Sequence, residues 1–381
     1  MKTDRKHQML ILEGRTYSAN EIYEITCQIR GGSGNLKDYS SCLERDPAYF
    51  VSHKDLFFFL EQWFDESPYV CVHTSGSTGK PKEQFVEKAR MMQSARMTCE
   101  YLDLREGYTA LLCMNLRYIG AMMMVVRALL TGMNLIVRTP SGHPFKDIKE
   151  PVHFVAMVPM QVYNTLQIAE ECNKFKCVEK VLVGGGPVSP ELERELRLFP
   201  NAVYSTYGMT ETLSHIALRR LSGSSSSEHY YPFSSVHLSL TGDDTLQIDA
   251  PLVVEGILKT NDIARLYPDG SFVILGRKDN VINTGGVKVQ VEQVEKKLSE
   301  FISVAFALTS VSDPKLGEKI VLLLESTDCV DQIKSDINSM LSLYERPKDI
   351  LLVNILPMTG NGKIDRPACK RMAEQMTATL L

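Results

Sequence analysis

The chain lacks the features that mark secreted or nucleic-acid-binding proteins. Its nine cysteines have no spacing for a disulfide framework or a zinc site, because the nearest pair, Cys172 and Cys177, has no matching second pair. Basic residues do not outnumber acidic ones, and a net charge of −4 provides no broad basic face for nucleic acid. We therefore expect reduced thiols in a cytoplasmic protein that does not bind nucleic acid.

Long hydrophobic runs are also absent. The most apolar stretch, Tyr118–Val137, has Arg127 near its middle and is divided by Gly132, so a buried helix followed by a strand fits it better than a membrane span. Met1–His7 is rich in charge and the apolar run Met9–Leu12 is too short for a signal peptide. The sequence predicts a cytoplasmic location and no membrane insertion.

The 381 residues, 44% of them hydrophobic, are enough for two domains or more. In the first half, apolar runs of strand length alternate with helical periodicity, which predicts an α/β domain with mostly parallel sheets and helices on both faces. Expected strands there are Tyr69–His73, Ala110–Met114, Asn134–Val137, His153–Val158, Lys180–Val183 and Ala202–Thr206; expected helices are Gln84–Tyr101, Met122–Leu130, Pro159–Ala169 and Pro190–Leu198. We expect residues 1–278 to form this domain and residues 279–381 a small, mobile α+β domain, with helices Val291–Leu298 and Asp331–Leu341 and strands Val304–Thr309 and Ile320–Leu324.

A loop rich in glycine and hydroxyl side chains follows the first of these strands. It reads Thr74, Ser75, Gly76, Ser77, Thr78, Gly79, Lys80, Pro81, Lys82. Glycine lets backbone N–H groups approach phosphate oxygens, the hydroxyls can donate, and the lysines add positive charge. The P-loop of ordinary NTPases is excluded, because two residues rather than four separate the glycines and proline follows Lys80. A plain turn between a strand and a helix is the alternative for this loop taken alone.

Five further segments follow along the chain. They are Val183–Val188 (VGGGPV), Tyr207–Thr212 (YGMTET), Thr260–Asp262 (TND), Gly276–Gly286 (GRKDNVINTGG) and Gly360–Arg366 (GNGKIDR). Together with the loop they resemble, in order, the motifs of the adenylate-forming superfamily, which includes acyl-CoA synthetases, carrier-loading adenylation domains and luciferases. The resemblance covers about residues 69–370.

The resemblance implies ATP, Mg²⁺ and CoA as cofactor and co-substrates, and it implies a role for each matching residue. Residues 74–79 and Lys82 would bind phosphates; Gly184, Gly185, Gly186, Pro187, Tyr207 and Gly208 would surround adenine. Thr210 would contact phosphate, Glu211 would hold Mg²⁺, Asp262 and Arg277 would bind ribose, Asp279 would be the hinge, Gly286 would line the pantetheine tunnel and Lys363 would bridge the carboxylate and the α-phosphate.

Two departures from the family pattern stand out. The phosphate loop begins at residue 74, about a hundred residues earlier than in most relatives, so the first subdomain must be reduced to something like Leu10–Phe64. Asn261 replaces the glycine of the usual Thr-Gly-Asp, while Asp262 is retained.

The acid pocket is expected around the apolar helix after Met114. Tyr118 stands where the family often has histidine, and an arginine at the position of Arg127 resembles o-succinylbenzoate–CoA ligases, whose substrate carries a second carboxylate. The segment Ser214–Ala217, with His215, and the compact length also resemble that subfamily. Arg127 could instead be a salt-bridged core arginine, and His215 a core histidine satisfied by its neighbours.

We therefore predict an AMP-forming acid–CoA ligase, with o-succinylbenzoate of menaquinone synthesis as the best single substrate. A stand-alone carrier-loading adenylation enzyme, or another acyl- or aryl-CoA synthetase, is an alternative. A non-catalytic nucleotide-binding protein on a degenerate ligase scaffold is a second alternative, which joint retention of Glu211, Asp262 and Lys363 argues against.

Overall fold

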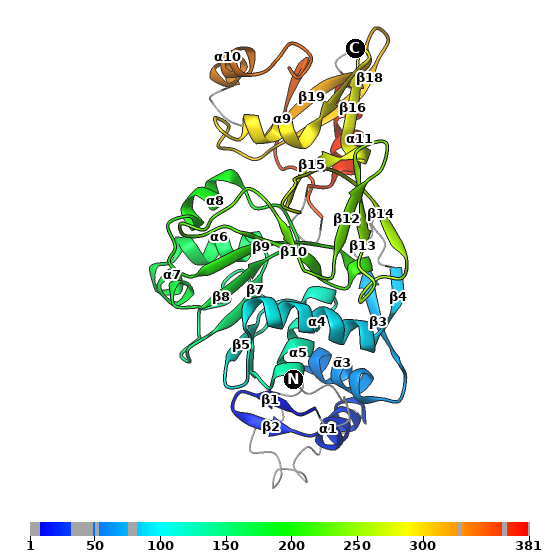
Figure 1. Cartoon of the computed structure of the whole chain (residues 1–381). Coiled ribbons are helices and arrows are strands. Elements are labelled where there is room, and N and C mark those ends of the chain that lie inside the picture. The colour runs from blue at the N-terminus through cyan, green and yellow to red at the C-terminus, as the bar shows by residue number, and fades with distance from the viewer. Residues whose placement is uncertain are drawn as a thin grey trace. The chain divides into compact units, whose positions relative to one another are not determined.

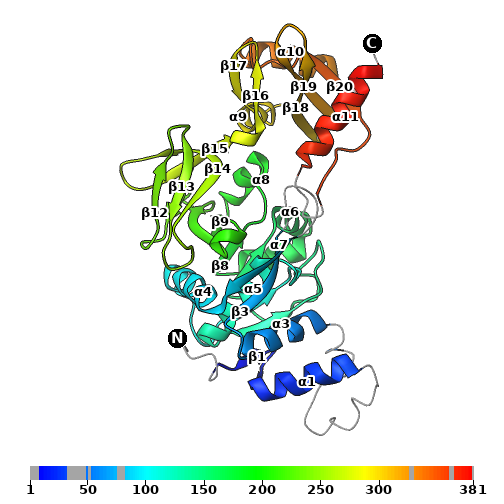
Figure 2. The same cartoon turned by 90° about the vertical axis from the view of Figure 1, so that its right-hand side faces the viewer.

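The computed structural model describes residues 8–31, 49, 53–74, 82–325, 330–359 and 364–379. These residues form two compact units (Figures 1 and 2). The first unit holds the described residues up to Val188, together with Leu192–His237 and Asp249–Ile257. The second unit holds Ser189–Glu191, Leu238–Ile248 and the described residues from Leu258 onward. None of the helices in the described ranges combines the length and the apolar character that crossing a bilayer requires.

The first unit is built on a nine-stranded sheet in the order β11-β10-β9-β8-β7-β5-β6-β1-β2. All neighbours from β9 to β1 are parallel, and the strands at both ends of the sheet are antiparallel. The strands are β1 (Leu10–Leu12), β2 (Arg15–Tyr17), β5 (Thr109–Leu112), β6 (Asn134–Val137), β7 (Phe154–Met157), β8 (Lys180–Val183), β9 (Ala202–Gly208), β10 (His215–Arg220) and β11 (Tyr231–Pro232). Apart from a polar first residue in β5, β6 and β8, the strands from β5 to β8 are apolar and buried, as parallel strands covered on both faces are.

The helices of the first unit are connections between strands and the covering layers of the sheet. They are α1 (Ala19–Gly31), α3 (Lys54–Phe64), α4 (Lys88–Leu102), α5 (Ile119–Thr131), α6 (Pro159–Gln167), α7 (Ala169–Lys176) and α8 (Pro190–Leu196). Helix α5 is buried on every side from Ala121 to Thr131, because it lies between α4 and the strands (Figure 1). It ends at Gly132, whose φ of 80° is the left-handed conformation that a helix C-cap often requires.

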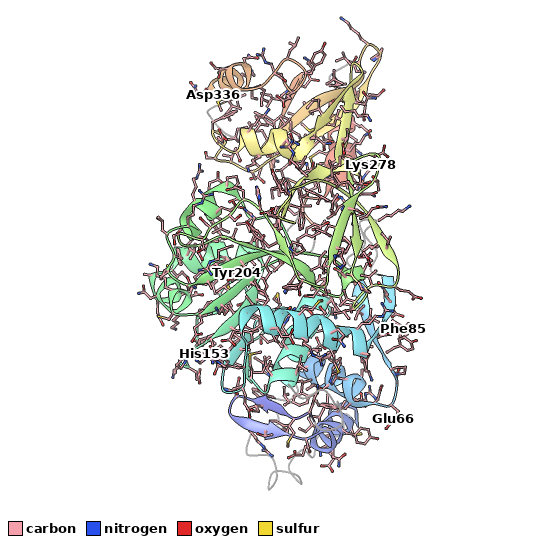
Figure 3. The ribbon with its side chains drawn as sticks, viewed as in Figure 1. Glu66, Phe85, His153, Tyr204, Lys278 and Asp336 are labelled. Atoms are coloured by element: carbon pink, nitrogen blue, oxygen red, sulfur yellow. The ribbon has the colours of Figure 1, made fainter. Side chains whose placement is uncertain are left out.

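A separate two-stranded sheet precedes α4. Strands β3 (Tyr69–Thr74) and β4 (Lys82–Glu87) pair antiparallel, and Phe85 on β4 lies 69% exposed at the surface (Figure 3). The predicted helix Gln84–Tyr101 is therefore wrong over its first residues, which continue β4. The predicted strand Tyr69–His73 is correct, but it pairs with β4 in the two-stranded sheet and does not belong to the large sheet.

The second unit contains two sheets. A four-stranded antiparallel sheet has the order β12-β13-β14-β15, and a five-stranded sheet has the order β17-β16-β19-β18 with β20 parallel to β19. The elements are β12 (His237–Leu240), β13 (Thr245–Asp249), β14 (Ile257–Leu266), β15 (Phe272–Arg277), β16 (Val281–Thr284), β17 (Val287–Gln290), α9 (Val291–Leu298), β18 (Phe306–Asp313), β19 (Gly317–Glu325), α10 (Val330–Met340), β20 (Asp349–Val353) and α11 (Arg366–Thr379).

Alternating side chains give the five-stranded sheet a core on each face. Leu322 and Leu324 of β19 pack with α9 and α10, whereas Val321 and Leu323 pack with α11 on the other face (Figure 2). Successive strand residues point to opposite faces, so one apolar run can supply both cores. The predicted α/β class, with mostly parallel strands in a large sheet and helices, is confirmed, and the structure adds smaller sheets. The boundary predicted at residues 278 and 279 stays a prediction.

Candidate active site

Two glycine-containing segments leave the same edge of the large sheet. Strands β8 and β9 are parallel neighbours with Val183 opposite Ser205, so the loop that starts at Gly184 lies beside Thr206 and Tyr207. A Cβ at Gly184 would lie 2.4 Å from the Thr206 hydroxyl oxygen, so any residue other than glycine would displace the Thr206 side chain or the loop. Ligands of open α/β sheets bind at the carboxyl ends of such strands. Gly184–Pro187 and Tyr207–Gly208 are therefore brought together as one edge of a possible nucleotide site.

The turn between β9 and β10 presents the carboxylate predicted to hold a cation. It contains the 3₁₀ turn Thr210–Thr212, braced because the Thr212 hydroxyl accepts from the Met209 N–H at 2.9 Å. Gly208 is required here, since a Cβ would lie 2.2 Å from the Ser214 carbonyl oxygen. Glu211 is exposed and has no hydrogen-bond or ion-pair partner among the described residues.

A layer of side chains supports Tyr207 from within the first unit. The rings of Tyr207 and Tyr230 are 6.0 Å apart, and the Tyr230 hydroxyl is hydrogen bonded to Ser205 at 2.8 Å. Behind Tyr230 lies the guanidinium of Arg219, 5.4 Å from the ring centre and paired with both oxygens of Glu193. This stack fixes Tyr230 and thereby limits the positions open to the Tyr207 ring.

The arginine predicted for the acid pocket is buried and has no counter-ion among the described residues. Arg127, 2% exposed on α5, donates from Nη2 to the hydroxyls of Ser214 at 2.8 Å and Thr98 at 3.3 Å, while its Nε has no partner. No carboxylate of a described residue lies within ion-pair distance of it. The alternative of a salt-bridged core arginine is thus wrong within the described part of the chain. Burial lowers the pKa of Arg127 to about 10, which leaves it charged at neutral pH.

His215 joins the two hydroxyls that accept from Arg127. Its Nδ1 lies 3.2 Å from the Ser214 hydroxyl and its Nε2 lies 3.0 Å from the Thr98 hydroxyl. Burial, and secondarily the charge of Arg127, lower the pKa of His215 well below 6.5, so the imidazole is neutral. Tyr118, by contrast, is 40% exposed before the first turn of α5, and its hydroxyl has no partner among the described residues.

The ribose-binding and hinge candidates lie together in the second unit. Asp262 of β14 is opposite Arg277 of β15, and the guanidinium donates to Asp262 at 3.0 Å and to Asp279 at 2.6 Å. The amide of Asn261 also donates to Asp279, at 2.9 Å. Lys278, labelled in Figure 3, is ion paired with Asp243. The residue that departs from the family's glycine therefore contacts the predicted hinge directly.

Gly286 lies in the two-residue turn of the β16–β17 hairpin. Gly285 and Gly286 have φ of 58° and 81°, and Thr284 pairs with Val287 across the turn. A two-residue hairpin turn with positive φ at both positions favours glycine for conformational reasons alone. Its predicted contact with pantetheine stays a prediction.

Part of the predicted site lies outside the described residues. Ser75, Gly76, Ser77, Thr78 and Gly79 of the phosphate loop, and Lys363 of the last motif, are in this group. For Thr74 and Lys82 the structure describes only the backbone, as the ends of β3 and β4.

Comparison of the sequence with known protein families matches it to one of them. A profile described as AMP-binding enzyme matches residues 37–256, more than half of the chain. The chain belongs to the AMP-binding enzyme family. The resemblance to adenylate-forming enzymes is confirmed with it.

Relatives of this AMP-binding enzyme include several named ligases. It is 34% identical to an acyl-CoA synthetase (AMP-forming)/AMP-acid ligase II-like protein from Dyadobacter fermentans, covering 83% of this chain and 93% of that one with a TM-score of 0.58. It is 24% identical to a 2-succinylbenzoate–CoA ligase from Listeria monocytogenes, covering 82% of this chain and 71% of the relative. The o-succinylbenzoate CoA synthetase of Bacillus subtilis, in complex with an acyl-adenylate intermediate, shares the fold at 18% identity, with a TM-score of 0.70 over 94% of each chain.

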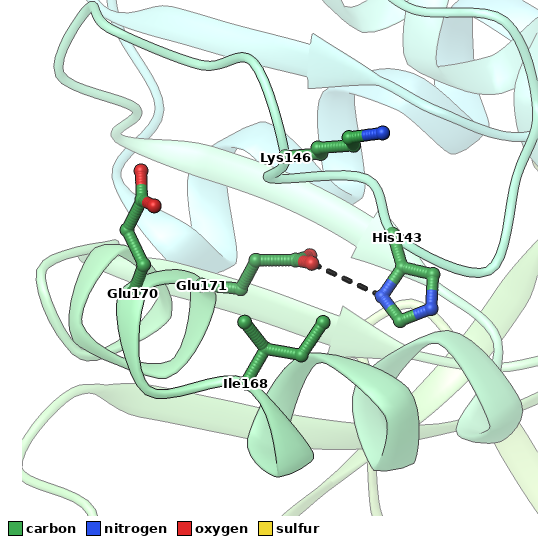
Figure 4. A pocket seen from close by; sticks show the side chains of 5 residues that line it. All are labelled: His143, Lys146, Ile168, Glu170 and Glu171. Atoms are coloured by element: carbon green, nitrogen blue, oxygen red, sulfur yellow. Dashed lines mark hydrogen bonds and ion pairs between the residues drawn. The ribbon is translucent and has the colours of Figure 1, made fainter.

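A separate hollow of about 300 Å³ lies on the first unit of this AMP-binding enzyme (Figure 4). His143, Lys146, Ile168, Glu170 and Glu171 line it. Glu171 is buried, and its two oxygens are hydrogen bonded to His143 at 3.0 Å and to the Phe145 N–H at 3.3 Å. These interactions tie the loop before Phe145 to α7, and none of the predicted site residues lines the hollow.

The hydroxyls that contact Arg127 and His215 belong to Thr98 and Ser214, two residues that motif matching did not single out. Thr98 lies in the middle of α4 and is separated from His215 by 117 residues, so no local pattern connects them. Ser214 precedes His215 within a segment already singled out, and its position beside the turn could have drawn attention to it.

Proposed function

We propose that this AMP-binding enzyme is an acid–CoA ligase that activates o-succinylbenzoate. Two observations support the acid. Relatives from Listeria and Mycobacterium tuberculosis are named 2-succinylbenzoate–CoA ligase and probable 2-succinylbenzoate–CoA ligase, and each covers at least 81% of this chain. The observation that carries the proposal is Arg127, a buried cation whose described partners are neutral.

A buried guanidinium without a counter-ion is unfavourable unless a ligand supplies the missing charge. The Nε of Arg127, buried and without a partner among the described residues, and the Ser214 hydroxyl are donors of the kind that bind a carboxylate. An acid with one carboxylate for activation would leave this cation unpaired. An acid with a second carboxylate, such as o-succinylbenzoate, would neutralise it.

The reaction has two steps. First, a carboxylate oxygen attacks the α-phosphorus of ATP, an acyl-adenylate forms, and pyrophosphate leaves with the electron pair of the broken P–O bond. Then the thiolate of CoA attacks the acyl carbon and AMP leaves. Residues 74–79 and Lys82 would hold the phosphates, Gly184–Pro187 and Tyr207–Gly208 would enclose adenine, and Thr210 would contact phosphate.

The residues present fit a magnesium ion held partly by ATP. Mg²⁺ in phosphate-transferring sites is usually bound by one or two carboxylates plus phosphate oxygens. Glu211 is an exposed carboxylate without a partner in the described chain, and the described residues hold no cluster of three or more ligating side chains. Bound there, Mg²⁺ would neutralise charge on the triphosphate. Glu211 would hold it, and the braced turn from Met209 to Leu213 would fix the carboxylate's position.

The second unit would supply the remaining groups. Asp262 would accept hydrogen bonds from the ribose hydroxyls, Arg277 would also contact ribose, and Gly286 would line the path of pantetheine. Lys363 would bridge the acid carboxylate and the α-phosphate, and rotation at Asp279 would withdraw it before the thiol arrives. We further propose a cytoplasmic location, because the seven described cysteines are all free thiols, as in a reducing compartment.

Pyrophosphate exchange across a panel of acids tests the proposal. Exchange should require Mg²⁺ and an acid, should be most efficient with o-succinylbenzoate, and adding CoA should give o-succinylbenzoyl-CoA and AMP. Lys363→Ala should abolish exchange while ATP still binds. Normal exchange by that variant would refute the role of Lys363.

The same assay separates the alternatives. More efficient exchange with a different acid would replace o-succinylbenzoate but keep the ligase. Transfer to a pantetheinylated carrier and not to CoA would establish carrier loading. Nucleotide binding without exchange for any acid would support a non-catalytic binding protein.

A further inference from the structure

Arg127, Ser214, His215 and Thr98 form a closed ring of hydrogen bonds in the first unit. Nη2 of Arg127 donates to Ser214 and Thr98, and the two nitrogens of His215 face the same two hydroxyls. The Thr98 hydroxyl also lies 3.2 Å from the Ser94 carbonyl oxygen, one turn earlier in α4. Because the imidazole is neutral, one of its nitrogens donates and the other accepts. The tautomer of His215 therefore determines which way both hydroxyls point.

With the proton on Nε2, every group in the ring is used. Ser214 donates to Nδ1, Nε2 donates to Thr98, and Thr98 donates to the Ser94 carbonyl. Together with the two bonds from Arg127, the ring then contains five hydrogen bonds. In this arrangement Ser214 has no proton left for a ligand.

With the proton on Nδ1, the ring contains four hydrogen bonds, because Thr98 turns from the Ser94 carbonyl to donate to Nε2. The Ser214 hydroxyl now accepts from Arg127 and from His215, and its own proton is free. A carboxylate beside Arg127 would accept that proton and restore the fifth bond, which would be charge-assisted and stronger than the bond to the Ser94 carbonyl. Both arrangements carry the same number of protons and the same charge.

We propose that His215 is a positioning residue whose tautomer changes when a carboxylate binds, so that Ser214 turns from a donor to the imidazole into a donor to the acid. This inference rests on the proposed function, since it takes the second carboxylate of the acid as the ligand of Arg127. The ring changes only for an acid with a second carboxylate, because a neutral group at that place offers no charge-assisted bond and leaves the five-bond arrangement in place.

Two acids form a matched pair for the test. o-Succinylbenzoate and 4-oxo-4-phenylbutanoate differ only in the ring carboxylate. The tautomer is read from ¹⁵N shifts of histidine-labelled protein, and the His215 signals are assigned by their loss in His215→Gln. We expect protonated Nε2 in the free protein, protonated Nδ1 with o-succinylbenzoate and α,β-methylene-ATP, and no change with 4-oxo-4-phenylbutanoate. The same tautomer in all three samples would overturn the proposal.

Kinetics of pyrophosphate exchange provide the second arm. His215→Phe, which places a ring beside Phe233 at a present centroid distance of 5.6 Å, and Thr98→Val both break the ring of hydrogen bonds. Each should lower KM for o-succinylbenzoate severalfold, because Ser214 can then donate to the carboxylate without the loss of the Thr98–Ser94 bond that the wild-type ring gives up. KM for 4-oxo-4-phenylbutanoate and for ATP should stay within about twofold, a change too small to indicate a missing hydrogen bond. Equal changes with both acids would show a merely structural role.

Thr165→Val is the matched control, because Thr165 is also fully buried and its hydroxyl has no partner among the described residues. It should leave both KM values unchanged. If the wild-type protein exchanges pyrophosphate with none of the acids tested, the proposed function fails. The tautomer measurement with o-succinylbenzoate still tests the ring in that case, because it requires binding and no turnover.

Discussion

Replacing Arg127 by methionine should leave the fold stable and remove recognition of the acid's second carboxylate. The guanidinium is 2% exposed and its described partners are two neutral hydroxyls. Burial lowers its pKa from 12.5 to about 10. At about 1.4 kcal/mol per pKa unit, holding this charge costs the folded chain about 3 kcal/mol.

The two hydrogen bonds from Arg127 offset most of that cost. Each bond from a charged donor contributes about 1.5 kcal/mol or more. The balance predicts that Arg127→Met changes the free energy of unfolding by no more than about 1 kcal/mol, since Ser214 and Thr98 remain bonded to His215. KM for o-succinylbenzoate should rise about 30- to 100-fold, because the substitution removes an attraction between two charges.

Arg219→Met is the matched control in the same unit. Arg219 is also buried, but it is paired with Glu193, so its removal should cost about 3 kcal/mol by leaving the carboxylate alone. Urea denaturation can be followed by fluorescence of Trp63, the single tryptophan, which is buried in the first unit. If Arg127→Met loses as much stability as Arg219→Met, the guanidinium has an ionic partner and the reasoning is refuted.

Three other predictions follow from single interactions. Burial lowers the pKa of His215 well below 6.5, so the unfolded chain takes up a proton before the folded chain does as the pH falls. Below about pH 6.5 the free energy of unfolding of the wild type should therefore fall by up to about 1.4 kcal/mol per pH unit more than that of His215→Gln. An equal pH dependence of the two proteins in urea denaturation would contradict this. Gly208→Ala should lower the thermal unfolding midpoint markedly, because its Cβ would lie 2.2 Å from a backbone oxygen. Gly242→Ala is the control, because a Cβ there meets nothing within 4 Å and the midpoint should not change. Equal changes of the midpoint in the two variants would exclude the steric cause. Asn261→Gly removes the 2.9 Å bond to Asp279, which would restrain rotation at the predicted hinge. The substitution should therefore speed thioester formation about fivefold relative to adenylation in single-turnover assays. An unchanged ratio of the two rates would show that the bond does not restrain the hinge.

Much of the fold could be predicted because the apolar periodicity is strong. The strand Asn134–Val137 and the helix Val291–Leu298 have the predicted ends. The error at Gln84–Glu87, which are predicted to begin a helix but lie in β4, has a physical cause. These residues have polar and apolar side chains in a pattern that a helix tolerates, but pairing with Tyr69–Thr74 extends them into a hairpin.

The candidate site was only partly predictable for a related reason. Motif order identified Glu211 and Asp262, because each lies inside a short conspicuous segment. Thr98 has no such segment, and its importance arises only when α4 packs beside α5 and β10. Likewise, the absence of a counter-ion of Arg127 among the described residues depends on its three-dimensional surroundings, which a single sequence does not reveal.

The turn between β9 and β10 links two ligands mechanically. Glu211, proposed to hold the metal of ATP, and Ser214, proposed to meet the acid, are joined by a turn in which the Thr212 hydroxyl binds the Ser214 carbonyl at 2.6 Å. A ligand that settles Glu211 or Ser214 in its binding position leaves the other group in position too, because the same braced turn holds both, so the two ligands should bind with positive cooperativity. By reciprocity, the acid would tighten ATP binding by the same factor that ATP tightens the acid. An enzyme built this way would make little use of ATP when its acid is scarce.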